Sequence, residues 1–105
     1  MNKAEKEVND LKQIHGTVFT LTVPLHDGKG SNAVVYLREL DRVVYSSVMK
    51  LIEKDELLGA ESMLKSLWVG GDNVELITKN FKALRSAAQT LGPILSVEAG
   101  DLKKN

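Results

Sequence analysis

The sequence of 105 residues contains no cysteine and only two prolines, and it has 14 acidic and 14 basic side chains. The absence of cysteine excludes disulfides, thiolate metal sites and a cysteine nucleophile. The zero net charge argues against non-specific nucleic-acid binding, which requires a basic surplus. The sequence lacks both a run of about 20 apolar residues and the apolar core of a signal peptide. We therefore expect a cytoplasmic protein without a membrane span.

The composition that remains is that of one small globular domain. Hydrophobic residues make up 43% of the chain and charged residues 27%, which is the balance of a folded protein. A chain of about 100 residues forms one domain, and no internal repeat or change of composition marks a boundary. We expect a single domain over residues 1–105. Residues 1–15 would be a helix, either docked or formed only with a partner, and residues 98–105 a frayed tail.

The N-terminal part of the sequence predicts a helix followed by a hairpin. Residues 3–14 carry apolar side chains every three or four positions, and Gly16 is a typical residue after a helix. Residues 17–25 alternate threonine with larger apolar residues, which predicts a strand. Pro24 cannot donate to a ladder, so this strand ends there or lies at a sheet edge, where it could pair with a second copy. A glycine-rich loop then leads to a second strand at residues 33–37.

The rest of the sequence changes to a helical period. Three helices are predicted, each preceded by a good capping residue: residues 42–54 after Asp41, residues 56–69 after Asp55, and residues 81–91 after Asn80, with the face Phe81, Leu84, Ala88 and Leu91. Residues 73–79 would form a short turn or helix, and Gly92-Pro93 would kink or divide the last helix. The expected fold is α+β, with an N-terminal helix and a two-stranded β-hairpin packed on three or more helices.

Few residues suggest chemistry. His15 and His26 lack the spacing of metal ligands, and the Gly28-Lys29-Gly30-Ser31 stretch is only a fragment of a phosphate loop, which is more simply a hairpin loop. Asp55-Glu56 is explained by an N-cap and a first-turn acid. Gly70-Gly71-Asp72 could bind an anion at a helix start, but a helix stop followed by a new N-cap is the simpler interpretation. We predict no catalytic, cofactor-binding or metal-binding residues.

One set of apolar residues is a candidate binding surface. It lies along the edge of the two middle helices, where methionines suit an adaptable apolar site and tryptophan and tyrosine suit an interface. The alternative is that all five residues belong to the core. The set consists of Tyr45, Met49, Met63, Leu67 and Trp68.

The segment from Tyr36 to Asp72 carries a resemblance to a known family. It reads YLRELDRVVYSSVMKLIEKDELLGAESMLKSLWVGGD, a strand ending in Leu-Arg, a D-R-x-x-Y helix, and a helix leading to V-G-G-D. This order resembles the small tail assembly chaperones of long-tailed bacteriophages and prophages. Ile14-His15-Gly16 and the strand residues Val18 to Val23 stand where that family has a K-x-x-H-G-like start that leads into a hairpin. The resemblance covers roughly residues 12–90.

The resemblance implies a non-enzymatic function. Such chaperones bind the tape-measure protein, a long helical polypeptide, and hold it soluble until tail-tube subunits polymerise around it. They act in several copies, which implies self-association here, and often have a longer frameshifted form. The alternatives are another small phage structural protein, such as a head–tail connector or tail subunit, or an interaction domain with a different partner.

Overall fold

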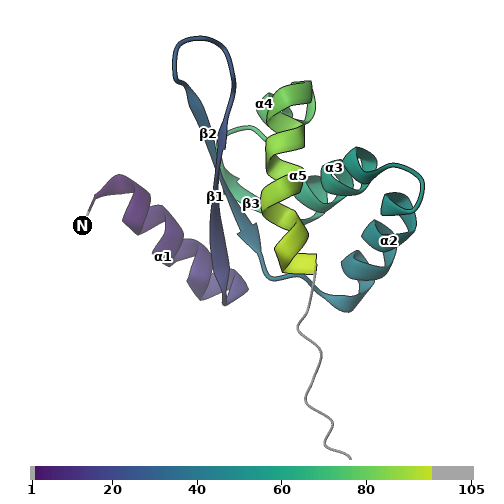
Figure 1. The fold of residues 1–105 in the computed structure, drawn as a ribbon. Coiled ribbons are helices and arrows are strands. Elements are labelled where there is room, and N and C mark those ends of the chain that lie inside the picture. The colour runs from purple at the N-terminus through teal and green to yellow at the C-terminus, as the bar shows by residue number, and fades with distance from the viewer. Residues whose placement is uncertain (1, 96–105) are drawn as a thin grey trace, which may run out of the picture.

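The computed structural model describes residues 2–95, which form five helices and a three-stranded antiparallel sheet (Figure 1). The predicted α+β class is confirmed. The tail predicted at residues 98–105 lies outside the described residues. The elements are α1 (Lys3–His15), β1 (Val18–Pro24), β2 (Asn32–Arg38), α2 (Arg42–Ile52), α3 (Glu56–Leu67), β3 (Trp68–Gly71), α4 (Glu75–Thr78) and α5 (Phe81–Leu95).

The sheet has the order β1-β2-β3, so the prediction of a two-stranded hairpin was wrong. The missing strand, β3, was assigned to the end of the helix over residues 56–69. That helix ends at Leu67, and Trp68 instead pairs with Leu37 of β2. The four residues of β3, Trp-Val-Gly-Gly, do not alternate apolar with polar side chains, so they show no strand period. Gly70 and Gly71 disfavour continuation of the helix. The backbone N–H and C=O groups at the edge of β2 offer them hydrogen-bond partners instead.

The end of β3 is fixed to β2 by a close approach that only glycine permits. Gly71 has a φ of +87°, and a Cβ there would lie 2.5 Å from the Val34 carbonyl oxygen. Next to it, the Asp72 backbone N–H donates to the Val34 carbonyl at 2.8 Å, and the Val34 N–H donates to the Asp72 carboxylate at 2.8 Å. Gly70-Gly71-Asp72 therefore ends a strand, and the prediction that Asp72 caps a helix was wrong.

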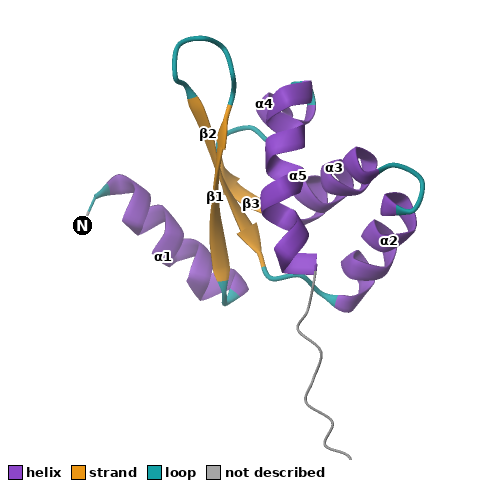
Figure 2. Cartoon of the chain, in the orientation of Figure 1, coloured by secondary structure: helices purple, strands orange, loops and turns teal. Residues whose placement is uncertain are grey.

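The sheet separates α1 on one face from the other helices on the opposite face (Figures 1 and 2). Leu21, Val23 and Val35 face the larger group of helices and belong to its core. Residues of the opposite parity, including Thr20 and Tyr36, border the space beside α1 instead. The main hydrophobic core therefore lies between the sheet and α2–α5.

The predicted helix caps are confirmed. The carboxylate of Asp41 accepts from the Val44 N–H at 2.8 Å, and that of Asp55 accepts from the Leu57 N–H at 2.9 Å. Asn80 accepts from the Ala83 N–H at 3.2 Å, and its amide nitrogen donates to the Leu25 carbonyl at 2.7 Å, which ties the start of α5 to the hairpin.

The last helix differs from its prediction in two respects. It is not divided at Gly92-Pro93, because Pro93 lies in its final turn, where the missing N–H leaves only one carbonyl of the preceding turn unpaired. Phe81, predicted on the apolar face, is 65% exposed, whereas Leu84 and Leu91 are buried as predicted.

The first helix is docked on the sheet, but only lightly. Its N-cap Asn2 accepts from the Glu5 N–H at 2.8 Å, and none of its side chains is buried. Two contacts attach it to β3: the Glu7 carboxylate accepts from the Gly71 N–H at 3.1 Å, and Leu11 lies beside Gly70. The neighbouring β1 is an edge strand, as Pro24 predicted. Pairing of that edge with a second copy stays a prediction.

Candidate functional site

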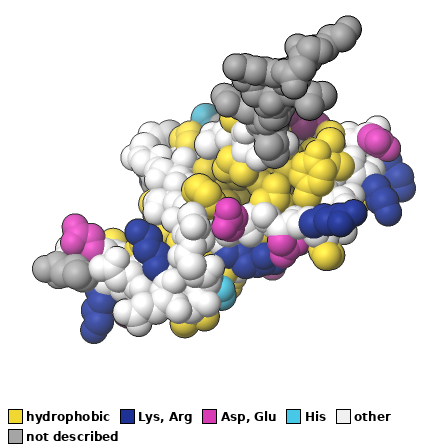
Figure 3. All heavy atoms as spheres, turned by 90° about the horizontal axis from the view of Figure 1, so that it is seen from below, with side chains coloured by type: hydrophobic (Ala, Val, Ile, Leu, Met, Phe, Trp, Pro, Cys, Tyr) yellow, Lys and Arg dark blue, Asp and Glu magenta, His cyan; other side chains and the backbone are white. Residues whose placement is uncertain are grey.

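An open apolar groove of about 420 Å³ lies where α2, α3 and α5 meet. Figure 3 shows hydrophobic side chains gathered on the face of the molecule seen from below, with charged side chains around them. Met49 and Ile52 of α2, Glu56, Ala60 and Met63 of α3, and Ala88, Leu91, Gly92 and Leu95 of α5 line the groove.

The groove results from small residues placed between larger ones. Ala60 and Ala88 leave space between α3 and α5, and larger side chains such as Ile52 border it. Gly92 adds a further opening, because a Cβ at this position would meet no heavy atom within 4 Å. The groove is thus an unfilled part of the helix packing, continuous with the core below it.

The structure brings two of the five candidate binding residues into this groove. Met49 is half-buried, and Met63 is fully buried beneath it, with an exposed fraction of 0%. Leu67, at 2%, belongs to the core. Met63 and Leu67 therefore do not lie on the surface, because α5 and the sheet cover the face of α3 that carries them.

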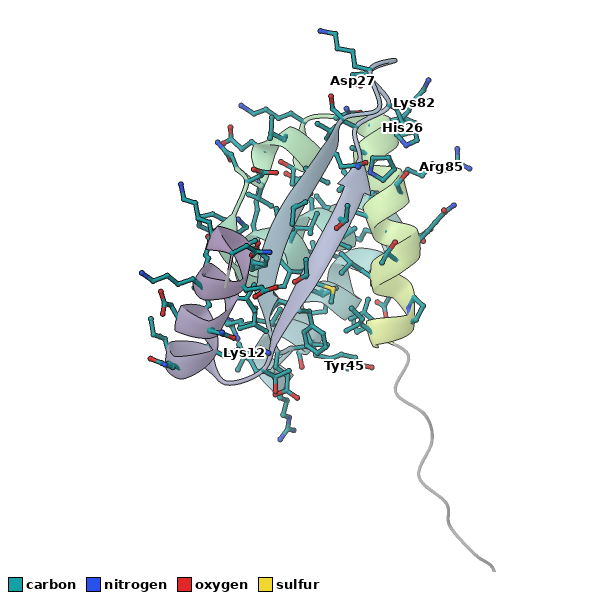
Figure 4. The ribbon with its side chains drawn as sticks, turned by 90° about the vertical axis from the view of Figure 1, so that its left-hand side faces the viewer. Lys12, His26, Asp27, Tyr45, Lys82 and Arg85 are labelled. Carbon is teal, nitrogen blue, oxygen red and sulfur yellow. The ribbon has the colours of Figure 1, made fainter. Side chains whose placement is uncertain are left out.

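Tyr45 and Trp68 are exposed but lie outside the groove. Tyr45 is 37% exposed on α2 and lies at the opposite end of the molecule from His26 (Figure 4). Trp68 is 40% exposed on β3, and its indole N–H donates to the Asp72 carbonyl at 3.0 Å. The sequence placed Trp68 within the helix predicted over residues 56–69, and that prediction is wrong because α3 ends before it.

The contribution of α5 to the groove was missed by the sequence interpretation. Its apolar face was recognised, but Gly92 was considered only as a helix breaker and Leu95 was not assigned to that face. The sequence did offer one signal, because no charged residue occurs from Ser86 through Leu95. A helix that buries only one apolar face normally carries charged residues on the other face. Glu56 was also missed as a site residue, because it was explained as a first-turn acid.

Arg38 and Asp41, which belong to the segment that resembles the chaperone family, join β2 to two of the helices that line the groove. The Arg38 guanidinium pairs with the Asp41 carboxylate at 2.8 Å and also donates to the Ser66 carbonyl at 3.3 Å. Hydrogen bonds from the Val44 backbone N–H and then from Arg38 hold the pKa of Asp41 below its usual value. This arrangement joins the end of β2 to the start of α2 and the end of α3.

A second polar cluster lies at the hairpin loop. The His26 Nε2 atom is 3.0 Å from the Ser86 hydroxyl of α5, near Lys82 and Arg85 (Figure 4). Hydrogen bonds from the side chain of Ser31 and the backbone of Lys29 lower the pKa of the adjacent Asp27. These contacts fix the loop against α5. Among residues 2–95, no carboxylate hydrogen-bonds to His26, so His26 and Ser86 lack the third member of a Ser-His-Asp arrangement there.

Within residues 2–95, no group of three or more His, Cys, Asp or Glu residues could hold a metal ion. His15, at the end of α1, and His26, in the hairpin loop, belong to different elements. In the same part of the chain, no helix combines the length and apolar character needed to cross a membrane. Comparison of the chain with protein-family models, with curated proteins and with solved structures finds no match.

Proposed function

We propose that this protein is a non-enzymatic tail assembly chaperone, which binds a helical segment of a phage tape-measure protein in the groove between α2, α3 and α5. The observation that carries the proposal is the groove itself, which is apolar and open to solvent. The half-buried Met49 lines it, together with the fully buried Met63. Amphipathic helices bind in such grooves through anchors at positions i, i+3, i+4 and i+7. Methionine adapts its shape to different anchors.

The identity of the partner rests on the resemblance of residues 12–90 to the chaperone family. The D-R-x-x-Y and V-G-G-D segments that carry it have structural roles in this fold: Asp41 caps α2, and Gly71 and Asp72 end β3. A chain with the same folding constraints but another partner would keep these residues. The proposal therefore needs a test with the partner itself.

The test is co-expression with the C-terminal part of the tape-measure protein encoded beside this chain. We expect the wild-type protein to keep that fragment in the soluble fraction and to co-purify with it. Met49→Glu places a charge in the groove and should reduce the recovered complex at least tenfold. Val43→Glu is the matched control, because Val43 lies on the same helix, is 76% exposed and does not line the groove.

A second variant fills the groove from the opposite side. Among residues 2–95, no atom of another element lies within 4 Å of a Cβ placed at Gly92, so Gly92→Leu should extend into the groove and weaken the complex in the same way. Its melting temperature, measured alongside, reports any cost of a bulkier residue before Pro93. A complex that survives both groove variants would place binding elsewhere. An insoluble tape-measure fragment with wild-type protein, or a gene neighbourhood without phage tail genes, would contradict the chaperone function.

A further inference from the structure

One charged residue lines the groove in the part of the chain that the structure describes, and its position points to the type of helix that would fit there. Among residues 2–95, that residue is Glu56. It lies in the first turn of α3, directly after the N-cap Asp55, and its side chain is exposed. The rest of the lining is aliphatic, thioether or glycine.

The Glu56 carboxylate is without an ion pair in the part of the chain that the structure describes. The glutamates at positions 61 and 75 each pair with a lysine four residues later, at 2.7 Å and 3.0 Å. Four residues after Glu56 stands Ala60, and three residues after it stands Gly59, so α3 offers it no cation at helical spacing. Its charge therefore borders the groove with only the N-terminal end of α3 to favour it and, among residues 2–95, no cation beside it.

An apolar helix that fills the groove would remove water from this carboxylate. Desolvating a charge without a partner is costly, whereas a cation placed beside it offsets that cost. A ligand with an acidic residue at the same point would add repulsion. The groove therefore discriminates between helices that have equal apolar faces but different charges, which is how specificity arises among similar ligands.

We propose that the groove binds an amphipathic helix whose apolar stripe is interrupted by one lysine or arginine, and that Glu56 pairs with this residue. The proposal rests on the proposed function, because it uses the same groove, and it adds the charge that selects the segment. Long helical polypeptides contain many amphipathic stretches, so a charge requirement would restrict binding to a few of them.

The test uses three labelled helical peptides of 18 residues, identical except for one stripe position that holds Lys, Gln or Glu. Binding is measured by fluorescence anisotropy. With wild-type protein we expect the Lys peptide to bind about tenfold more tightly than the Glu peptide, with the Gln peptide between them. High salt should reduce this difference. Glu56→Gln should remove most of it, and Glu56→Lys should reverse the order.

Glu53→Lys is the matched control, since it makes the same change of charge three residues away at an exposed position outside the groove lining. It should keep the wild-type order of the peptides. An order that is unchanged in Glu56→Lys, or equal binding of all three peptides to the wild type, would overturn the charge inference. In either case, Met49→Glu tells the two proposals apart: loss of peptide binding in that variant supports the groove as a helix site even though the charge inference has failed.

Binding of none of the peptides, in a protein that still solubilises the tape-measure fragment, would also overturn the charge inference. The chaperone function would then stand with a different contact surface. A lysine in the first turn of α3 opposes the helix dipole only slightly, so we expect Glu56→Lys to fold normally. Circular dichroism of each variant verifies this.

Discussion

The two faces of the sheet are stabilised in different ways, although both are covered by helices. On one face, α2–α5 bury a continuous core that includes Met63, Leu64 and Ile77, each with an exposed fraction of 0%. On the other face, α1 buries none of its own residues and is attached by Glu7 and Leu11. Burial of apolar area is the dominant stabilising contribution, so the two faces should contribute very unequally to the free energy of unfolding.

An amphipathic sequence alone does not determine how firmly a helix packs against the sheet. The α1 sequence has its apolar residues at helical spacing, but the sheet residues beside it, Thr20, Val34 and Tyr36, form a smaller and partly polar surface. The apolar stripes of α3 and α5 meet each other and a face rich in leucine and valine. The strength of docking depends on what lies opposite the stripe, which the sequence of the helix does not contain.

The largest expected effect is on the core face. Leu64→Ala should lower the free energy of unfolding by about 3–4 kcal/mol, because it leaves a cavity at a fully buried position. Urea denaturation followed by circular dichroism measures this. Leu58→Ala on the same helix is the control, since Leu58 is 42% exposed and its loss should cost less than about 1 kcal/mol. Equal losses of unfolding free energy in the two variants would contradict the placement of Leu64 in the core and of Leu58 at the surface.

The next largest loss of stability is expected at β3, which pairs with β2 and contacts α1. Gly71→Ala should destabilise the protein by about 2–3 kcal/mol, because it combines a positive φ with a clash against the Val34 carbonyl. Gly16→Ala separates the two causes, since Gly16 has a φ of +78° but open space around it. It should cost only about 1 kcal/mol. Similar losses at both positions would show that the close approach at Gly71 is unimportant.

A smaller effect is expected for α1. Leu11→Ala should cost at most about 1 kcal/mol, as for a side chain on a lightly packed surface. Hydrogen exchange gives the sharper measurement: amides of α1 should exchange through local opening at a much lower free energy than amides of α3. Protection of α1 equal to that of α3 would mean that the two faces unfold together and that the comparison is wrong.

The smallest effect concerns the polar join at the start of α2. The folded-state pKa of Asp41 lies below its ordinary value of 3.8, so its charge stabilises the fold above that pH. This contribution is lost as the pH falls through the folded pKa. Asp41→Asn keeps a capping oxygen but loses the ion pair with Arg38. Its stability should be below that of the wild type at neutral pH and approach it as the pH falls below 3.8, as measured by urea denaturation. A constant difference would contradict this role.

Local signals in the sequence predicted most of the fold. Asp41, Asp55 and Asn80 each cap a helix through a side chain that acts within three residues, and the strand over residues 17–25 shows its period directly. The strand β3 was not predictable in the same way. It has four residues, and its extended form depends on pairing with β2, which is more than 30 residues away.

The candidate site was predicted only in part for a related reason. A stripe on one helix shows which residues are apolar, but not which of them another helix covers. Met49 and Met63 were predicted, and both line the groove; Leu67, chosen by the same pattern, is in the core. Gly92 could not be selected at all, because its contribution is empty space, which becomes visible only when α5 is placed against α3.

A residue that does not line the groove lies directly behind one that does. Gly59 lies on α3 against α2, and a Cβ there would overlap the side chain of Ile52, which does line the groove. Any larger residue at position 59 therefore requires Ile52 or its helix to shift, which would alter the groove lining from behind. A mutational scan of exposed groove residues would miss this position, although a buried methyl group there would change the shape that the groove presents.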